Sequence, residues 1–392
     1  MKVIEYGLDS CNHCLKCVKV CPTEAIRIVD NKVVIDDNKC IYCDKCIHIC
    51  NKGGLKVDNS HMSLTFQDFD YKVALIPTSV FSDFQTEEEA SQMFKAIEKL
   101  GFDEVIDYSD IEGALYLKTI EYARNSEELK FSSFCPCINH LIKQQYPMLY
   151  KDLVPFDYPV EVAAKRVRER IKDKGKVGIY SLCDCVGKKT LAKHPFNNEK
   201  SNIDHAMSLS HIFPKALKLK NEEKKDIHLC REGIQSVVSD FYHYGQLDKP
   251  LIAVSGVDHC IQALELAEFG HLDDLNLMAL FACQGGCIGG RYLWSNPFTG
   301  RLHIDTMSQF ANTKPALIDD EKCFKNRKLD KQDKMTMKEK MKLYNKLNQI
   351  LESLPRYDCG ACGYPNCKAL ANDIYSEKAT LHDCRVRKEG NI

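Results

Sequence analysis

The chain has 392 residues, a length typical of two or three domains, with 54 Lys and Arg against 55 Asp and Glu and a formal net charge of −1. This balance argues against binding to nucleic acid or to a membrane surface. No apolar run approaches the ~18 residues that a membrane span requires, and residues 1–11 lack an apolar signal-peptide core. The 21 cysteines therefore indicate metal ligation in a reducing cytoplasm, and an anaerobic setting, rather than a disulfide framework.

Two matched cysteine runs open the chain: Cys11, Cys14, Cys17 and Cys21, then Cys40, Cys43, Cys46 and Cys50. Each reads C-x2-C-x2-C-x3-C, the spacing of bacterial ferredoxins with two [4Fe–4S] clusters, where the fourth ligand comes from the other run. The predicted ligand sets are Cys11, Cys14, Cys17 and Cys50, and Cys40, Cys43, Cys46 and Cys21. Zinc requires only four ligands and does not account for two matched runs. Residues 1–62 are therefore predicted to form a double [4Fe–4S] ferredoxin domain.

A third cysteine group lies near the other end, with the spacing C-x2-C-x4-C-x16-C: Cys359, Cys362, Cys367 and Cys384. Gly360 and Gly363 allow the backbone to wrap closely around a cluster, and Pro365 stiffens the turn. The run resembles the small [4Fe–4S] modules of Rnf-type electron-transfer subunits and corrinoid iron–sulfur proteins, with a zinc ribbon as the alternative. We expect a small, mainly α-helical module with one cluster within residues 326–392.

Residues 334–354 are predicted to form a helix that Pro355 ends. Five apolar residues recur there at helical spacing: Met337, Met341, Tyr344, Leu347 and Leu351. The stripe is interpreted as a packing face or a dimer seam, so a homodimer is one expected assembly. The charge-rich residues 319–334 before it are expected to be a linker.

The middle of the chain, residues 63–325, alternates strand-like and helical segments. Lys72–Ile76, Lys176–Ser181 and Asn276–Phe281 are short apolar runs that fit buried strands. Cysteine- or glycine-containing loops lie at or just beyond their ends. Ligands of α/β sheets usually bind at the carboxyl ends of the strands, so we expect a site formed by these loops.

Three segments in the middle and the preceding ferredoxin run carry a family resemblance. Residues 132–136 (SSFCP), 185–189 (CVGKK) and 282–290 (ACQGGCIGG) resemble, in order, the three active-site motifs of the [FeFe]-hydrogenases. The resemblance implies a two-lobed α/β domain with a cubane between the lobes, ligated by Cys135, Cys185, Cys283 and Cys287. It further implies that Cys287 bridges to a two-iron subcluster with CO and cyanide ligands. Lys188 would donate to one cyanide, and Pro77-Thr78 would cradle the other.

The sequence also differs from the family pattern at positions on the proton route. Phe134 occupies the place of the cysteine that passes protons to the two-iron site, and a phenyl ring has no exchangeable proton. Leu191 and Ala279 stand where glutamates are usual, and Val160 replaces a glutamine. General acid–base assistance is typically worth ~10²–10⁴ in rate. We therefore expect an oxidoreductase of hydrogenase type that is slow or sensory toward H2, and whether it is an enzyme stays open.

Four further thiols lie in or near the same motifs: Cys137, Cys183, Cys230 and Cys260. Thiolates are cluster ligands themselves, so these residues could hold a second iron–sulfur cluster in place of the two-iron subcluster. Inert burial is the other interpretation, and it is favoured for Cys230. His259, beside Cys260, is expected to be structural.

Three functional hypotheses follow. The first is a hydrogenase-family redox or H2-sensing protein that passes electrons between surface cubanes and a central cluster. The second is a non-hydrogenase oxidoreductase or electron-transfer protein with a remodelled central iron–sulfur site. The third is a cluster-stiffened scaffold for a signalling partner. The expected partners are an electron donor or acceptor such as ferredoxin and, for a sensor, a separate signalling protein.

Overall fold

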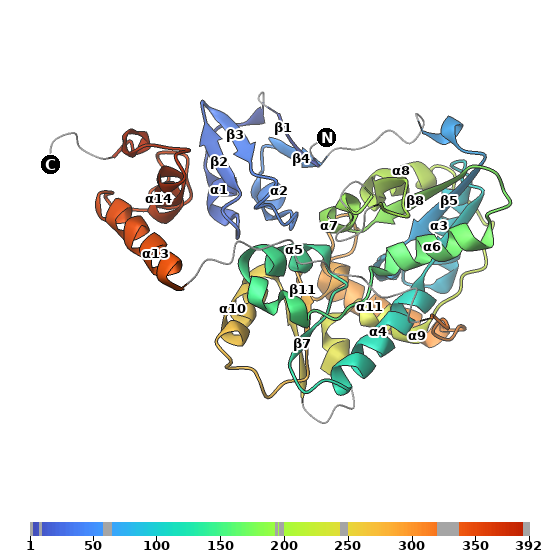
Figure 1. The fold of residues 1–392 in the computed structure, drawn as a ribbon. Helices are drawn as coiled ribbons and strands as arrows, with labels where there is room; N and C mark the ends of the chain where they lie inside the picture. The colour runs from blue at the N-terminus through green and yellow to red at the C-terminus, as the bar shows by residue number, and fades with distance from the viewer. Residues whose placement is uncertain are drawn as a thin grey trace. The chain divides into compact units, whose positions relative to one another are not determined.

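The computed structural model describes residues 3–7, 10–57, 65–192, 195, 200–243, 250–319 and 337–386. The chain divides into two compact units (Figure 1). Unit 1 combines residues 1–40, 44–58 and 328–392, and unit 2 combines residues 41–43 and 59–327. The predicted domain boundaries near residues 62 and 325 lie outside the described residues and stay predictions.

The amino-terminal part of unit 1 is built from two small antiparallel ladders and two one-turn helices. Strand β1 (Ile4–Tyr6) pairs with β4 (Leu55–Val57), and β2 (Ile26–Val29) pairs with β3 (Lys32–Ile35). Helices α1 (Lys16–Val20) and α2 (Lys45–Ile49) each begin one residue before the third cysteine of a run. The duplicated spacing therefore produces a duplicated local structure.

The carboxyl-terminal part of unit 1 is helical, as expected. It comprises α13 (Met337–Glu352), α14 (Cys367–Tyr375) and the short 3₁₀ helix η9 (Leu381–Asp383). Helix α14 begins at Cys367 because the Asn366 side chain caps it by accepting the N–H of Ala369 at 2.7 Å. Leu351 of α13 packs against a small core around Leu354 and Leu370, whereas Met341 and Tyr344 of the predicted stripe are exposed.

The two parts of unit 1 pack against each other through strand β2. The N–H of Ile28 donates to the carbonyl of Gly363 at 3.0 Å, and Asp373 of α14 forms an ion pair with Arg27. The Ile28 carbonyl also lies only 2.4 Å from the position that a Cβ at residue 363 would take, and Gly363 has φ +86°. This close approach requires glycine.

Replacing Gly363 with Ala tests that close approach. We expect G363A to lower the free energy of unfolding by about 2–4 kcal/mol, because the methyl group meets backbone and the φ is unfavourable for an L side chain. The matched control is G53A, since Gly53 has φ +64° but its nearest neighbour, Lys56 Cε, lies 4.0 Å from the added Cβ. Urea unfolding of the cluster-loaded protein measures both variants. Equal destabilisation would contradict the packing argument.

Unit 2 contains two parallel sheets. The first has the order β6-β5-β8-β9 and the second has the order β10-β11-β7. The strands are β5 (Tyr71–Ile76), β6 (Glu104–Asp107), β7 (Lys130–Phe131), β8 (Val177–Cys183), β9 (His205–Ser208), β10 (Leu251–Ser255) and β11 (Leu277–Phe281). The three strands predicted from sequence correspond to β5, β8 and β11. The expected α/β class with two lobes is confirmed.

Helices connect these strands. The α-helices are α3 (Glu87–Glu98), α4 (Ser109–Arg124), α5 (Pro136–Gln145), α6 (Pro159–Arg170), α7 (Val186–Thr190), α8 (Leu209–Leu217), α9 (Arg231–Ser236), α10 (Val257–Glu268) and α11 (Pro297–Met307). Short 3₁₀ helices include η4 (Thr78–Asp83), η6 (Ser239–His243) and η7 (Cys287–Gly289). Among the described residues, no helix is both long and apolar enough to cross a bilayer.

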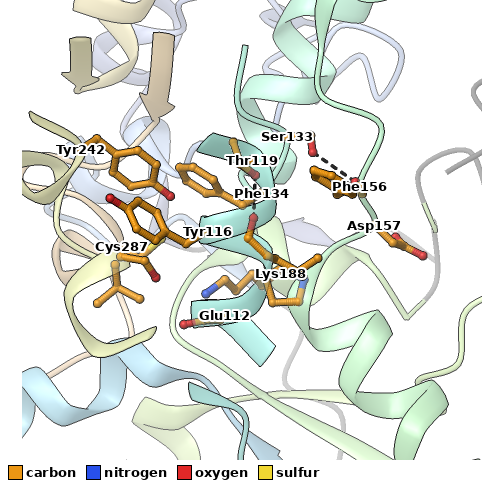
Figure 2. Close-up of a pocket in the computed structure, with 14 residues that line it drawn as sticks. Glu112, Tyr116, Thr119, Ser133, Phe134, Phe156, Asp157, Lys188, Tyr242 and Cys287 are labelled. Atoms are coloured by element: carbon orange, nitrogen blue, oxygen red, sulfur yellow. Dashed lines mark hydrogen bonds between the residues drawn. The ribbon is translucent and has the colours of Figure 1, made fainter. Parts of the chain in front are cut away.

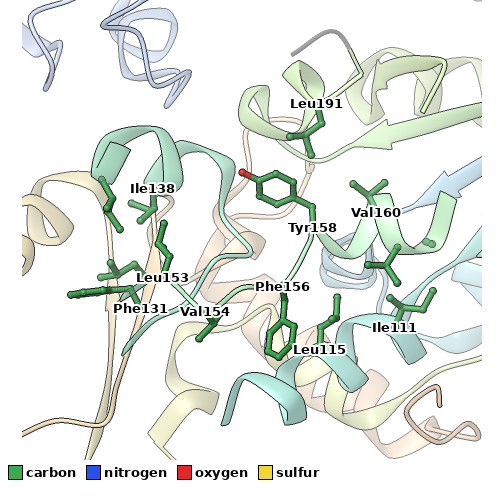
Figure 3. Close-up of a cluster of buried hydrophobic side chains, with 14 of the residues drawn as sticks. Ile111, Leu115, Phe131, Ile138, Leu153, Val154, Phe156, Tyr158, Val160 and Leu191 are labelled. Carbon is green, nitrogen blue, oxygen red and sulfur yellow. The ribbon is translucent and has the colours of Figure 1, made fainter. Parts of the chain in front are cut away.

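One large apolar core joins the two sheets of unit 2 (Figure 3). It contains Leu75 and Ile179 from the first sheet together with Phe131 and Met278 from the second. Because a single close-packed core includes strands of both sheets, the strand ends of the two sheets are held in a fixed relation. That relation positions the loops described below.

Candidate iron–sulfur centres

The cysteines of the first predicted ferredoxin ligand set all lie in unit 1. Burial raises the pKa of the Cys17 thiol to about 11, and negative charge on Cys11, Cys50 and Cys14 adds to the effect. Cys50 therefore lies with the first run. Burial acts to raise the pKa of Cys50, but the backbone N–H groups of residues 52–55 outweigh it, and the net shift is downward. Backbone donors directed at sulfur suit a thiolate that ligates a cluster.

The two cysteine runs share an unusual backbone pattern. His13 and Leu15 have positive φ, and so do Tyr42 and Asp44 at the same offsets in the second run. These left-handed residues flank the second cysteine of each run and curl the loop tightly. In the second ligand set, Cys21 Sγ accepts the N–H of Ala25 at 3.3 Å. Residues 41–43 belong to unit 2, so convergence of this set stays a prediction.

The four carboxyl-terminal cysteines surround one cavity: Cys359, Cys362, Cys367 and Cys384. Burial raises the pKa of Cys362, and the charges of Cys384 and Cys359 add to it. Asp358 Oδ1 accepts the N–H of Cys367 at 2.7 Å, which fixes the loop against α14. Four thiols around a space, rather than at a point, fit the predicted [4Fe–4S] cluster.

The central cysteines all follow the carboxyl ends of parallel strands. Cys135 lies between β7 and α5, Cys185 caps α7 after β8, and Cys283 and Cys287 follow β11. The cavity that they line, here called the central cavity, comprises Phe134, Cys135, Pro136, Cys137, Asp184, Cys185, Lys188, Phe281, Ala282, Cys283, Gly286 and Cys287. The four thiols predicted from three separate motifs therefore meet at one place.

Backbone around the central cavity approaches the sulfurs closely. The pKa of Cys135 falls to about 7, chiefly through a hydrogen bond from Cys137, which outweighs burial, and the backbone N–H of Ala282 contributes. The N–H of Lys188 donates to Cys185 Sγ at 3.5 Å. Gly286 has φ +107°, and a Cβ added to it would lie only 2.3 Å from the Val237 carbonyl oxygen, so the loop passes very close to that backbone. The donor set and the compact loops fit a [4Fe–4S] cluster.

A second cavity, here called the flanking pocket, adjoins the central one (Figure 2). It is lined by Glu112, Leu115, Tyr116, Thr119, Ser133, Phe134, Phe156, Asp157, Pro159, Lys188, Ser236, Val237, Tyr242 and Cys287. Phe134, Lys188 and Cys287 belong to the walls of both cavities. The Cys287 thiol, the Lys188 ammonium group and the Phe134 ring therefore lie between the central cavity and the flanking pocket.

Lys188 is engaged in a buried ion pair. Its Nζ donates to Asp184 Oδ2 at 2.7 Å, and the same oxygen accepts the hydroxyl of Ser79 at 2.5 Å. Burial acts to lower the pKa of Lys188, but the negative charges of Asp184, Cys287, Tyr108 and Glu112 together outweigh it, so the pKa is raised. The lysine is therefore charged and already hydrogen-bonded, and its expected contact with a cyanide stays a prediction.

Glu112 of α4 is buried in the wall of the flanking pocket, with 7% of its surface exposed. Burial raises its pKa to about 7, and the charge of Lys188 opposes that shift. Among the described residues, Asp184 Oδ1 has no hydrogen-bond partner. The Thr78 hydroxyl lies near the Glu112 carboxyl and acts to lower its pKa, although the pair does not form a hydrogen bond of regular geometry. Sequence reasoning missed both acidic residues. Asp184 stands between Cys183 and Cys185, and Glu112 interrupts the apolar face of a helix.

The positions that differ from the family pattern pack as apolar side chains. The Phe134 ring lies 4.7 Å from that of Phe281 and stacks at 5.9 Å on that of Tyr242, between ring centroids. Leu191 and Val160 lie in the large apolar core (Figure 3), and Ala279 lies in the neighbouring core around Tyr242. These side chains offer no exchangeable proton.

The four additional thiols do not converge. Cys137 lines the central cavity, whereas Cys183 donates to the Ser181 carbonyl at 3.5 Å, Cys230 to Glu232 Oε2 at 3.3 Å and Cys260 to the Phe281 carbonyl at 3.3 Å. Burial raises the pKa of Cys183 and Cys230 to about 12. The structure therefore offers no shared cavity for a second cluster on these four residues. His259 is exposed, with Nδ1 3.1 Å from the Ser255 carbonyl.

Three family models match separate parts of the chain. Residues 3–51 match a 4Fe-4S dicluster domain, residues 72–218 match the C-terminal domain of the iron only hydrogenase large subunit, and residues 354–386 match the FeS (Fe-S cluster) model. The hydrogenase match includes the first two motifs and ends before Cys283. No curated protein matches the chain.

Solved [FeFe]-hydrogenase structures are similar at low identity. HydA(deltaEFG), from work on stepwise H-cluster assembly, is 14% identical, with a TM-score of 0.46 over 60% of this chain and 84% of its own. A variant of HydA1 from Chlamydomonas reinhardtii is 13% identical, with a TM-score of 0.45 over 60% of this chain and 84% of its own. A structure from work on oxygen inactivation is 13% identical, with a TM-score of 0.45 over 60% and 83%.

Glu112 should make stability depend on pH. Its pKa is raised on folding, so between about pH 4.5 and 7 the folded state binds the proton that the unfolded state has lost, and stability falls as pH rises through that window. We expect E112Q to lack this pH-dependent loss of stability. Between pH 4.5 and pH 8, its free energy of unfolding should rise relative to that of the parent by on the order of 1–3 kcal/mol. Urea unfolding at the two pH values measures it. A difference between parent and variant that does not change with pH would contradict the burial argument.

Proposed function

We propose that this hydrogenase-family iron–sulfur protein carries electrons to and from a central [4Fe–4S] cluster ligated by Cys135, Cys185, Cys283 and Cys287, and turns over H2 slowly or not at all. The observation that carries the proposal is the meeting of these thiols, from three motifs and two sheets, around one cavity. When bound, the cluster supplies one-electron transfer in a site that the chain shields from solvent.

Contacts inside each unit support a route for the electrons. In unit 1, the loop of the carboxyl-terminal cysteines passes close to the loop of the first run, since a Cβ added to Gly360 would lie 3.4 Å from Leu15 Cδ1. In unit 2, Cys137 Sγ lies 3.4 Å from the Tyr42 carbonyl oxygen, and the pKa of Cys137, raised chiefly by its contact with Cys135, is raised further by Cys43. Cys137 thus stands between Cys43, a predicted ferredoxin ligand, and Cys135.

A small electron carrier such as ferredoxin, in a reducing cytoplasm, is the partner we propose for unit 1. The predicted clusters there are held by surface loops, with Cys14 and Cys359 exposed. Exposed ligand loops allow an incoming carrier to approach the cluster closely. A homodimer through the exposed Met341 and Tyr344 of α13 is a further proposal, as is a separate signalling protein in the case of a sensor.

Slow or absent H2 chemistry is supported by the apolar packing of Phe134, Leu191 and Val160. A non-hydrogenase oxidoreductase is the second candidate, and one observation favours it. Lys188 is bonded to Asp184, and Glu112 adds a carboxyl group beside Cys287, so the space next to the central cluster is acidic. An anionic group with cyanide ligands would meet two carboxyl groups there beside the one ammonium group of Lys188.

Iron content tests the central cluster. We expect C287S to lose about four irons per chain and to leave the ferredoxin-type signals unchanged, because serine is a poor ligand for a cubane. The control is C183S, whose thiol is buried but bonded to Ser181, and it should retain the parent iron content. Electron paramagnetic resonance of the reduced proteins identifies the missing cluster. Unchanged iron in C287S would overturn the assignment.

A second test restores the thiol at residue 134. We expect F134C to raise H2 evolution by less than about threefold, since no two-iron group is proposed for it to serve. A functional relay would contribute ~10²–10⁴. The comparison is made after co-expression with the hydrogenase maturation enzymes, at matched iron content. A gain in that range, together with infrared bands of CO and cyanide, would show that a two-iron subcluster is present and would contradict a central site that holds only the [4Fe–4S] cluster.

A further inference from the structure

The central cavity is lined by one thiol more than a [4Fe–4S] cluster uses. Besides the four predicted ligands, Cys137 contributes to the wall, and only 4% of its surface is exposed. Cys183, Cys230 and Cys260 are not among the described residues that line this cavity. A cubane takes four thiolates, so the fifth thiol at the same cavity needs a role of its own.

Cys137 lies in the first turn of α5, and its sulfur is held by close contacts. Its Sγ lies 3.4 Å from the carbonyl oxygen of Tyr42. It also packs on Gly187 of the second motif, where an added Cβ would lie only 2.6 Å from the sulfur. A thiolate would meet the lone pairs of the carbonyl oxygen, whereas a thiol meets that oxygen with its hydrogen. The position is therefore that of a hydrogen-bond donor rather than of a cluster ligand.

A second acceptor for the same thiol is the sulfur of Cys135. The contact between these two side chains is the largest influence on the pKa of Cys135, which it lowers against the effect of burial. A thiol has one hydrogen, which turns about the Cβ–Sγ bond, so it can serve either the Tyr42 carbonyl or the Cys135 sulfur. Reduction of a cluster adds negative charge to its ligand sulfurs, which makes Cys135 the stronger of the two acceptors.

We infer that Cys137 is a positioning residue of the central site and not a ligand: its thiol, placed between the Tyr42 carbonyl and the Cys135 sulfur, raises the reduction potential of the central cluster. The inference rests on the proposed function, since it requires a cluster on Cys135. Hydrogen bonds to ligand sulfurs stabilise the reduced state, and they act strongly where water is excluded. Tyr42 belongs to the second ferredoxin run, so a higher central potential favours electron flow from that run inward.

Redox titration of the cluster-loaded protein, followed by electron paramagnetic resonance, measures this potential. The central cluster is identified by the signal that C287S lacks. We expect C137A to keep the parent iron content, because the thiol is not a ligand. Its central cluster should be harder to reduce by about tenfold in the equilibrium constant, which is about 59 mV for one electron. C137S keeps a donor of similar size and should stay within about twofold of the parent.

C183A is the matched control for lost packing. Cys183 is also buried and lies near a predicted ligand in the sequence, but its thiol donates to the Ser181 carbonyl and does not line the central cavity. Loss of this thiol removes a similar volume from the core without removing a donor to the cluster. C183A should therefore keep the parent potential. Shifts of equal size in C137A and C183A would assign the effect to packing and overturn the inference.

The outcomes distinguish this inference from the proposed function. A parent protein without a signal that C287S removes overturns the proposed cluster, and the inference falls with it. With that signal present, an unchanged potential in C137A overturns the inference alone, and so does a C137S potential that follows C137A rather than the parent. Loss of iron from C137A would make Cys137 a ligand and would also overturn the inference, while the proposed cluster would stand.

Discussion

The central site depends on a constraint of parallel sheets: their strands end on the same edge, so the loops that follow them meet there. Cys135, Cys283 and Cys287 follow strands of one sheet, and Cys185 follows a strand of the other. The sheets share one apolar core, which keeps their edges facing a common cavity. Burial of that core therefore positions four thiols that are far apart in the sequence.

Buried charged side chains determine which groups the flanking pocket, next to the central cavity, can accommodate. Lys188 is retained beside Cys287, but Asp184 binds it from inside the second motif and Glu112 approaches from α4. An ammonium paired with a carboxylate offers little to a second anion, whereas an unpaired carboxyl group favours a donor. Phe134 and Tyr242 form an aromatic wall of this pocket, and the Phe134 ring has no exchangeable proton to pass on.

Unit 1 is also held together by contacts between segments that are far apart in the sequence. Its small ladders and helices bury little apolar surface on their own, so the predicted clusters and the packing of the two parts have to contribute to stability. The Ile28–Gly363 bond and the Arg27–Asp373 pair join residues more than three hundred positions apart. The same packing brings cysteine loops of the two parts close together, an arrangement that suits the proposed electron transfer.

The sequence by itself determined the ferredoxin spacing, the carboxyl-terminal cysteine group and the strands β5, β8 and β11, because ligand spacing and strand periodicity are local properties of the chain. It indicated the four central cysteines only through the resemblance of three short motifs to those of a known family. Tertiary structure alone decided the rest. Cys183 lies inside a motif as Cys137 does, and the sequence left both open as ligands, whereas it favoured inert burial for Cys230. In the structure Cys183, Cys230 and Cys260 each donate to a different acceptor. Glu112 carried no motif at all. Its place beside Lys188 results from the packing of α4 against distant segments, and no local pattern encodes such a contact.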